Sequence, residues 1–287
     1  MNFAIRYLTE YHYDRPVEDN LNVLRITPAT TATQRCEGVD LLVEPEARLT
    51  RHHDYFDTQV IELGVAAAHE QLTIDARARV ATTPPPAPAD PPWSAIADEP
   101  YREAAAEFLI DPRPAPADGM VDELVAATRA DTPLATVERL VEVIPDRFEY
   151  QPGSTYVGST VEDLLAGGAG VCQDFVHLSL ILLRRHGIAA RYVSGYLFAA
   201  PDGDATESLE VAMHAWIEAL LPDGDGDHGA WVGADPTNRR LPGEDYVKVG
   251  HGRHYADLPP IKGVFRGGGS SRMDARVTMT RTDPPSA

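Results

Sequence analysis

The stretch Gly167-Gly168-Ala169-Gly170-Val171-Cys172-Gln173-Asp174-Phe175-Val176-His177-Leu178 decides the fold of this chain. A glycine-rich approach ends in a cysteine, and an apolar segment follows that Gly187 closes. Phe175, Leu178 and Leu182 recur at helical spacing within that segment. A glycine at Gly187 is typical of the residue that ends a helix. The pattern therefore predicts a helix that begins near the cysteine and ends at Gly187.

Cys172 lies at or just before the first turn of this predicted helix. Backbone N–H groups have no partner there, and the helix dipole is positive. A thiol loses its proton most easily in that position, and the thiolate is the nucleophilic form. The preceding glycines allow a tight turn that leaves the sulfur open to a substrate. Free cysteines are also common as small apolar core residues, so the segment alone leaves a packing role open as well.

The composition of the 287-residue chain excludes some classes of partner. There are 25 Lys and Arg residues against 44 Asp and Glu residues, which gives a net charge of −19, and no basic cluster stands out. Such a chain repels phosphate backbones, so nucleic acid is not expected as a partner. Hydrophobic residues make up 43% of the chain, which is enough for one large or two ordinary domains.

The cysteine content and the N-terminus bear on location. The two cysteines, Cys36 and Cys172, form no disulfide framework, and we expect both to be free thiols in a reducing compartment. Residues 1–6 lack the apolar run of a signal peptide, and no later segment approaches a membrane-spanning length. The sequence therefore predicts a cytoplasmic protein with no membrane partner.

Residues 1–82 alternate between apolar and polar side chains, as strands do. No helical stripe interrupts this alternation, which is clear at 3–8, 39–43, 58–63 and 71–80. We expect an N-terminal antiparallel β-sandwich. Six prolines between Pro84 and Pro92 then mark an extended linker. The chain is thereby divided into the β-domain (1–82), the linker (83–93), a catalytic core (94–266) and a C-terminal tail (267–287) with a possible last strand.

The second domain begins with helices and continues with strands. Helices are expected at 99–109 and 118–130, after Thr132 and after Thr160, where Asp163 stands at the third position of a capping box. Strands are expected at 190–197, 212–220 and 230–234. Helices followed by antiparallel strands indicate an α+β domain.

Two segments carry residues that bind metals in other proteins. His52-His53-Asp54 places adjacent residues that point to opposite faces of a strand, so a solvated loop is favoured over a ligand set. The loop 223–229 has the alternating acids of an EF-hand, but His228 and Ala234 stand where glycine and glutamate are required. A polar hairpin loop is favoured there, and no metal site is predicted.

His214 and Asp235 complete a candidate site with Cys172. A thiolate becomes an acyl-transfer catalyst when an imidazole pairs with it and a third group orients that imidazole. Taken alone, His214 would be a buried strand histidine, and Asp235 a turn residue. If their strands are antiparallel neighbours packed on the cysteine helix, the three side chains converge.

Four segments resemble successive motifs of the transglutaminase-like superfamily. They are Gly170-Val171-Cys172-Gln173-Asp174-Phe175, 190–196, Met213-His214-Ala215-Trp216 and 233–238. The resemblance extends over most of the chain and is greatest to the bacterial branch that carries an N-terminal β-domain. It implies a papain-like α+β core, with Cys172 as nucleophile, His214 as general base and acid, and Asp235 as the group that orients His214. It also implies a reaction that needs no metal and no organic cofactor.

Two departures from the family pattern bear on the cleft. The acidic loop between the His214 and Asp235 strands lengthens a hairpin that is usually shorter. No tryptophan matches the one that assists the transition state in animal transglutaminases, and Tyr150 is the nearest candidate for its place. Tyr150 and Gln173 are candidates for the second oxyanion donor, and Trp216 for the lining of the cleft.

Three hypotheses about function follow. The first is a cysteine peptidase or amidase that acts on peptide or isopeptide bonds of a peptide or protein substrate. The second is a protein-glutamine transglutaminase, in which an amine replaces water as the acceptor. The third is a non-catalytic scaffold that binds a partner through the β-domain. The presence of Cys172, His214 and Asp235 together argues against the third.

Overall fold

One long strand, β1 (Asn2–Leu24), organises the N-terminal region of the computed structural model, which describes residues 1–112, 119–156, 158–199, 208–223 and 229–282. The first half of β1 pairs antiparallel with β5 and β14, and its second half pairs with β4 and β13. Farther out, β2 pairs with β5, β9 with β14 and β3 with β4. These strands are β2 (Gln34–Glu44), β3 (Arg48–His53), β4 (Gln59–Val65), β5 (His69–Thr82), β9 (Ser208–Val211), β13 (Ile261–Arg266) and β14 (Ser271–Arg281).

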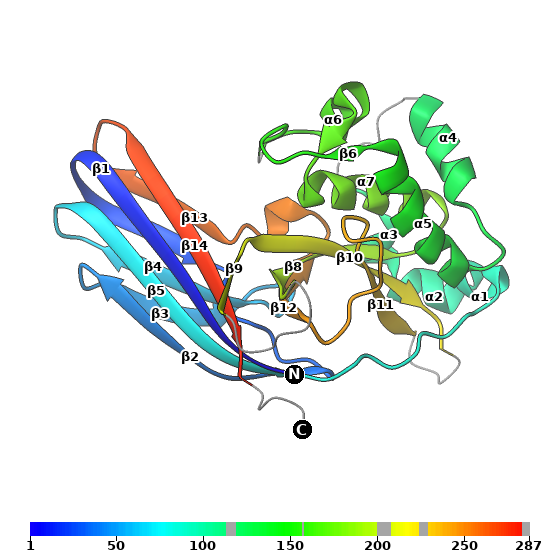
Figure 1. The fold of residues 1–287 in the computed structure, drawn as a ribbon, viewed down its shortest axis with the longest axis horizontal. Helices are drawn as coiled ribbons and strands as arrows, with labels where there is room; N and C mark the ends of the chain where they lie inside the picture. The colour runs from blue at the N-terminus through cyan, green and yellow to red at the C-terminus, as the bar shows by residue number, and fades with distance from the viewer. Residues whose placement is uncertain (113–118, 157, 200–207, 224–228, 283–287) are drawn as a thin grey trace.

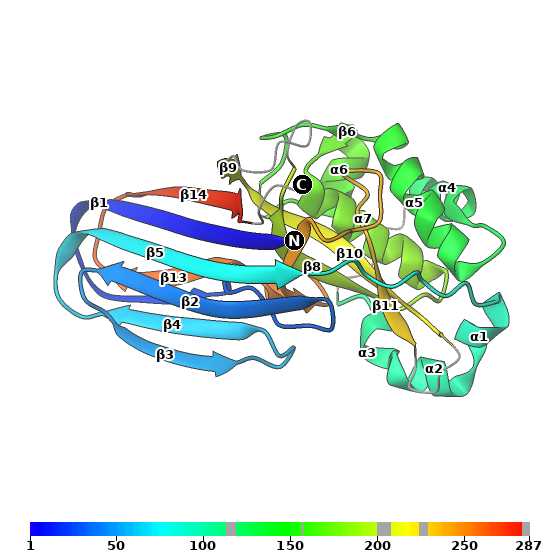
Figure 2. The ribbon, with the colours of Figure 1, turned by 60° about the horizontal axis from the view of Figure 1, so that its bottom comes forward.

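Strand β1 runs through both layers of the sandwich: its first half belongs to the layer with β5 and β14, and its second half to the layer with β4 and β13 (Figure 2). Alternate residues of its first half, Phe3, Ile5 and Tyr7, are almost completely buried. They belong to one apolar cluster with Leu63 of β4 and Leu72 of β5. The predicted N-terminal antiparallel β-sandwich is confirmed.

The C-terminal segment returns to this first domain. Strand β14 pairs with the first half of β1, in the tail where the sequence indicates a possible last strand. Strand β13 pairs with the second half, so residues 261–266 belong to the sandwich and not to the core, where the sequence boundary at 266 had placed them. Alternation along a strand indicates that the strand exists but not which strand it pairs with. The expected domain boundary at 266 therefore differs from the observed one.

The second domain, to the right in Figure 1, contains helices that pack around a four-stranded antiparallel sheet. The expected helix at 99–109 is observed as two short helices, α2 (Glu99–Ala104) and α3 (Ala106–Leu109). The helix expected after Thr132 begins at Pro133, with the Thr132 hydroxyl accepting the Ala135 N–H at 3.1 Å. The helices are α1 (Trp93–Ala97), α2 (Glu99–Ala104), α3 (Ala106–Leu109), α4 (Gly119–Thr128), α5 (Pro133–Arg147), α6 (Val161–Gly167), α7 (Cys172–Arg185) and the 3₁₀ turn η2 (Tyr255–Asp257).

The sheet of this domain has the strand order β11-β10-β8-β12. Its strands are β8 (Ala190–Leu197), β10 (Met213–Leu221), β11 (Ala230–Ala234) and β12 (Tyr246–Gly252). The strand before Asp235 is thus the antiparallel neighbour of the strand that carries His214. Helix α7 packs against β8 and β10. The short strand β7 (Ala169–Gly170) comes just before α7 in the chain and pairs in parallel with β6 (Glu149–Tyr150). Of the loop at 223–229, residues 224–228 lie outside the described residues.

The two domains meet along β8 and β12. The buried Tyr196 of β8 donates a hydrogen bond from its hydroxyl to the carbonyl of Ile26 at 2.7 Å. The Gln34 amide bonds both backbone groups of Lys248, donating to its carbonyl at 2.7 Å and accepting its N–H at 2.8 Å. The β-domain therefore holds the outer strand β12 of the second domain's sheet.

Candidate active site

Cys172 is the first residue of α7 and is half-buried, so the predicted helix start is confirmed. Gly168 has a φ of +71°, a left-handed conformation that favours glycine. A Cβ on Gly170 would lie only 2.8 Å from Leu164 Cδ1 and 3.0 Å from Asp174 Oδ2. These two glycines therefore allow the tight approach that places the sulfur at the positive end of the helix. Both Cys172 and Cys36 are free thiols.

Asp174 holds the turn that precedes Cys172. Its Oδ2 accepts the Val171 N–H at 2.8 Å and the Thr155 hydroxyl at 2.6 Å, and the residue is only 2% exposed. The second bond ties the segment after Tyr150 to the helix start. Sequence reasoning assigned Asp174 no place in the site, although an acidic residue three positions into a helix is a capping signal.

Tyr150 lies beside the approach to the cysteine. It pairs with Gly170 in the parallel β6–β7 ladder, and its ring meets Phe175 edge-on at 6.3 Å. Partial burial raises the pKa of Tyr150, and the negative charges of Cys172 and Asp235 add to the effect. The residue is 49% exposed. The other oxyanion candidate, Gln173, is the half-buried second residue of α7.

His214 bridges the cysteine and the aspartate. Its Nε2 lies 2.7 Å from Asp235 Oδ2, and because a carboxylate only accepts, Nε2 carries a proton. Burial alone would lower the pKa of His214, but hydrogen bonds with Asp235 and Cys172 raise it to about 9. With Nε2 committed to Asp235, Nδ1 is the nitrogen left to face the thiol. The structure therefore brings together the three residues that the sequence singled out.

Asp235 is fully buried and its carboxylate is saturated with donors. Oδ1 accepts the backbone N–H groups of Thr237 at 2.8 Å and Asn238 at 3.2 Å. Oδ2 accepts the Asn238 amide and the Tyr246 hydroxyl, each at 2.7 Å, in addition to His214. Burial opposes ionisation, but these bonds keep the pKa of Asp235 below its usual value. Sequence reasoning missed the roles of Asn238 and Tyr246; Asn238 stands in the quoted motif, whereas Tyr246 had no local signal.

Trp216 lies under the site and not on the wall of a cleft. It is only 3% exposed, stacks against the His214 ring at 6.2 Å and meets Tyr246 edge-on at 5.3 Å. A Cβ on Gly195 would lie 2.7 Å from the Trp216 ring, so glycine makes room for the indole over β8. The structure therefore gives Trp216 a packing contact with the imidazole.

A further carboxylate of this domain, Glu218, lies two residues beyond Trp216 on β10, with its side chain 13% exposed. Its Oε2 is 2.6 Å from both Lys248 Nζ and Arg191 Nη2. Burial would raise the pKa of Glu218, but the two cations lower it to about 2. Burial lowers the pKa of Lys248 to about 8, against the attraction of Glu218. This cluster joins β8, β10 and β12.

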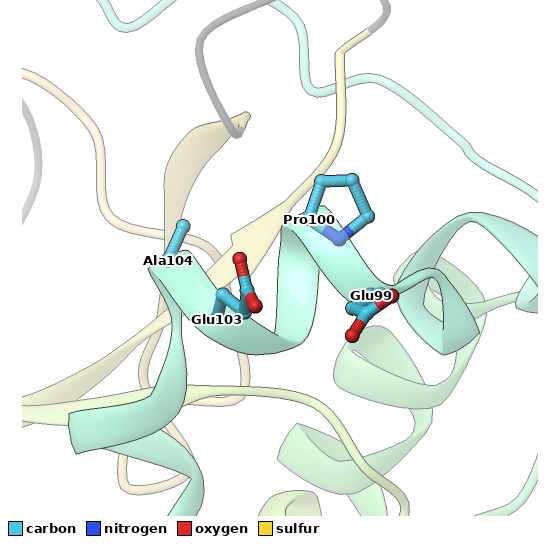
Figure 3. Close-up of a pocket in the computed structure, with 4 residues that line it drawn as sticks. All are labelled: Glu99, Pro100, Glu103 and Ala104. Atoms are coloured by element: carbon cyan, nitrogen blue, oxygen red, sulfur yellow. The ribbon is translucent and has the colours of Figure 1, made fainter.

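The described residues contain no group of three or more histidine, cysteine or acidic side chains placed to hold a metal ion. His52 and His53 lie on the exposed strand β3, where the sequence had favoured a loop. In the part of the chain that the structure describes, no helix is long and apolar enough to cross a membrane. A hollow of about 530 Å³ lies on α2, away from the candidate site. Figure 3 shows the four residues that line it, Glu99, Pro100, Glu103 and Ala104.

Comparison with known proteins identifies the family. Residues 120–236 match the transglutaminase-like superfamily core, and residues 3–81 match the bacterial transglutaminase-like N-terminal region. "Uncharacterized protein Rv2569c" of Mycobacterium tuberculosis (strain ATCC 25618 / H37Rv) is 34% identical over 274 residues, which cover 92% of this chain and 87% of that protein. The solved structure of a "Putative Cysteine Protease from Cytophaga hutchinsonii" has a TM-score of 0.77 at 21% identity and covers 100% of this chain and 92% of that one.

A shorter similarity links the chain to a protein-glutamine gamma-glutamyltransferase of Pseudomonas aeruginosa (strain PAO1). It is 26% identical over 147 residues, or 46% of this chain and 21% of that protein. The chain belongs to the transglutaminase-like superfamily and carries the N-terminal region of its bacterial branch. At the level of the family, the matches support a cysteine-dependent enzyme.

Proposed function

We propose that the protein is a cysteine peptidase or amidase that hydrolyses amide bonds of peptides or proteins through a thioester. The single observation that supports it best is the position of His214, which bonds Asp235 through Nε2 and also bonds the Cys172 thiol. A histidine with only a packing role requires no thiol at a helix start beside one nitrogen and no fully hydrogen-bonded carboxylate beside the other.

The proposed reaction uses His214 twice. The thiol proton passes to Nδ1, and the thiolate attacks the amide carbonyl carbon to form a C–S bond. The imidazolium then gives the Nδ1 proton to the leaving nitrogen, the C–N bond breaks, and a thioester remains. In the second step Nδ1 takes a proton from a water molecule, and the water oxygen attacks the thioester carbon to form a C–O bond. The C–S bond breaks, releasing the carboxylic acid and the thiolate that pairs again with the imidazolium.

The developing oxyanion has one donor on the main chain. As the first residue of α7, Cys172 carries an N–H group with no carbonyl partner within the helix. For the second donor we propose the Tyr150 hydroxyl of β6 or the Gln173 amide of α7. The variants Tyr150→Phe and Gln173→Ala each remove one of these donors, and loss of the true donor should lower the acylation rate by roughly 10²-fold.

The test is thioester formation with a panel of peptide amides, followed by mass spectrometry of the intact protein. We expect one acyl adduct on Cys172, none in Cys172→Ala or His214→Ala, and full labelling in Cys36→Ser. Cys36 is a suitable control because burial raises the pKa of its thiol. Adducts that persist in Cys172→Ala, or Cys172 that alkylates no faster than free cysteine at neutral pH, would refute the proposal.

The second candidate function is amine transfer, which the similarity to the gamma-glutamyltransferase favours. Hydrolysis is preferred because water is always present, whereas transfer requires a dedicated amine site. The two are separated by following how the acyl-enzyme divides between water and an added primary amine. A predominant amine product would replace the peptidase proposal with a transglutaminase, without changing the roles of Cys172, His214 and Asp235.

A further inference from the structure

A second cavity, of about 420 Å³, lies at the end of α7 opposite to Cys172. Its lining includes Arg102 of α2, Arg129 after α4 and Arg184 in the last turn of α7, together with the indole of Trp93. We call it the arginine pocket. Because α7 has 14 residues, about 20 Å of helix separates it from the cysteine.

The positive charge of this pocket is poorly neutralised. Among the described residues, the one carboxylate paired with any of the three arginines is Asp111, whose Oδ2 lies 3.4 Å from Arg184 Nη1. His186 also lines the pocket, but burial lowers its pKa to about 4, so it adds no charge at neutral pH. Three permanent cations thus converge in a chain whose net charge is −19.

Arg184, Arg129 and the aromatic wall are held in place by contacts within the fold. The Arg184 side chain is 4% exposed, and it donates hydrogen bonds to the carbonyls of Phe108, Ala190 and Arg253. The Trp93 indole donates to the Ala130 carbonyl at 3.1 Å. The Arg129 guanidinium lies over the Trp93 ring, 3.3 Å from its centroid. The Trp93 indole and the Arg184 guanidinium therefore need little reorganisation when a ligand binds.

Helix α2 contributes both to this pocket and to the hollow of opposite charge in Figure 3. Glu99 and Glu103 line that hollow, one turn apart on the helix, whereas Arg102 lines the arginine pocket. The two carboxylates of α2 therefore face a different cavity from its arginine.

We propose that the arginine pocket binds a small organic carboxylate with a flat apolar body. The volume is in the range of ligand sites. Arg129 covers one face of the Trp93 ring, and Ile96 and Leu109 add apolar lining that suits an aromatic or branched body. Guanidinium groups recognise a carboxylate through paired hydrogen bonds, which suits Arg102 and Arg129 at the mouth. The pocket is separate from the proposed peptidase site, and its ligand is not the substrate.

The test is calorimetric titration with 1-naphthoate at low salt, using 1-naphthalenemethanol as the neutral analogue and inorganic phosphate as the charge-only probe. We expect one naphthoate site per chain, at least tenfold tighter than either probe and weakened by added salt. The double variant Arg102→Gln/Arg129→Gln should lose at least tenfold in affinity. Arg276→Gln, an exposed arginine of β14, should retain it.

Several results would overturn this proposal. Equal affinity for naphthoate and the neutral analogue, or an unchanged naphthoate affinity in the double variant, would remove the role of the arginines. Equal affinity for phosphate would remove the role of the apolar wall. Loss of binding after Cys172 is alkylated would place the ligand in the active-site cleft instead. If the double variant does not fold, the single variant Arg102→Gln, at an exposed position, is expected to weaken binding at least threefold.

Discussion

Two largely buried carboxylates, Glu218 of β10 and Asp235 just after β11, differ in the kind of partner that holds them. Glu218 is held by two cations, Lys248 and Arg191, each at 2.6 Å. Asp235 is held by the Tyr246 hydroxyl, the Asn238 amide and two backbone N–H groups, and His214 is its one partner that can carry a charge. Both carboxylates have a lowered pKa, so both are ionised at neutral pH.

The difference shows how one sheet uses a buried charge in two ways. His214 is the largest favourable influence on the ionised form of Asp235, and the Asn238 amide and Tyr246 hydroxyl add to it. The charge of Asp235 is therefore coupled to His214 as the imidazole gains and loses a proton. The cations around Glu218 balance its charge permanently, which suits a role in holding three strands together. The comparison predicts that changes at Asp235 affect chemistry and that changes at Glu218 affect stability.

The largest expected effect is on reactivity in Asp235→Asn. The amide donates a hydrogen bond where the carboxylate accepts one, which favours the wrong tautomer of His214, so acylation of Cys172 should fall by roughly 10³–10⁴-fold. Stopped-flow acylation with a peptide ester measures it. Asp245→Asn, which changes an aspartate paired with Arg240 near the surface, should stay within twofold. A loss below tenfold in Asp235→Asn would mean that Asp235 does not orient the imidazole.

The next effect is on stability in Glu218→Gln. Removal of this charge leaves Lys248 and Arg191 buried without a counter-ion, and the free energy of unfolding should fall by about 3–5 kcal/mol. Urea denaturation measures this, and the reactivity of Cys172 in the folded fraction should change little. Glu142→Gln, at an exposed pair with Arg239, should lose at most about 1 kcal/mol. Comparable losses in the two variants would remove the contrast between the carboxylates.

The third effect is on the pH dependence of stability. The folded-state pKa of His214 is about 9, above the unfolded value of 6.5, so its protonation stabilises the fold fully below pH 6.5. That contribution should be lost as the pH rises from 6.5 through 9 and amounts to about 3 kcal/mol at most. Unfolding of the wild type and His214→Gln at pH 5.5, 7.5 and 9.5 measures it. A difference that grows with pH would have the wrong sign for an imidazolium beside Asp235.

Glu218 should behave in the opposite sense. Its folded-state pKa is lowered to about 2, so its contribution is present above the unfolded value of 4.5 and is lost as the pH falls through 2. The stability difference between the wild type and Glu218→Gln should therefore be flat between pH 6 and 7 and shrink in acid.

The smallest effect is expected in Tyr246→Phe. It removes one neutral donor from a buried carboxylate, so acylation should slow by roughly tenfold, the equivalent of one hydrogen bond to a charged group. The Tyr246 hydroxyl lowers the pKa of Asp235, so the acid limb of the rate profile should move to higher pH in the variant. Tyr255→Phe, a half-buried tyrosine of η2, should leave that limb in place. A slower rate with an unshifted limb would mean that Tyr246 only packs.

Local patterns predicted much of the site and its scaffold. The glycines before Cys172 and the apolar stripe after it predicted the start of α7, because a helix start is decided by residues within one or two turns. The capping box at Thr160 and Asp163 was readable for the same reason. Alternation predicted β8 and β11 at the observed residues.

What the sequence by itself determined about this protein is therefore its α+β elements and the three residues of its candidate site, each indicated by its neighbours in the chain. Only the tertiary structure decided which strands pair with β1. The C-terminal strands at 261–266 and 271–281 pair with it and complete the first domain. It alone placed Tyr246 against Asp235, and Lys248 against Glu218. The physical reason is that a hydrogen bond or ion pair across a sheet depends on strand order, and alternation along one strand carries no record of its neighbours.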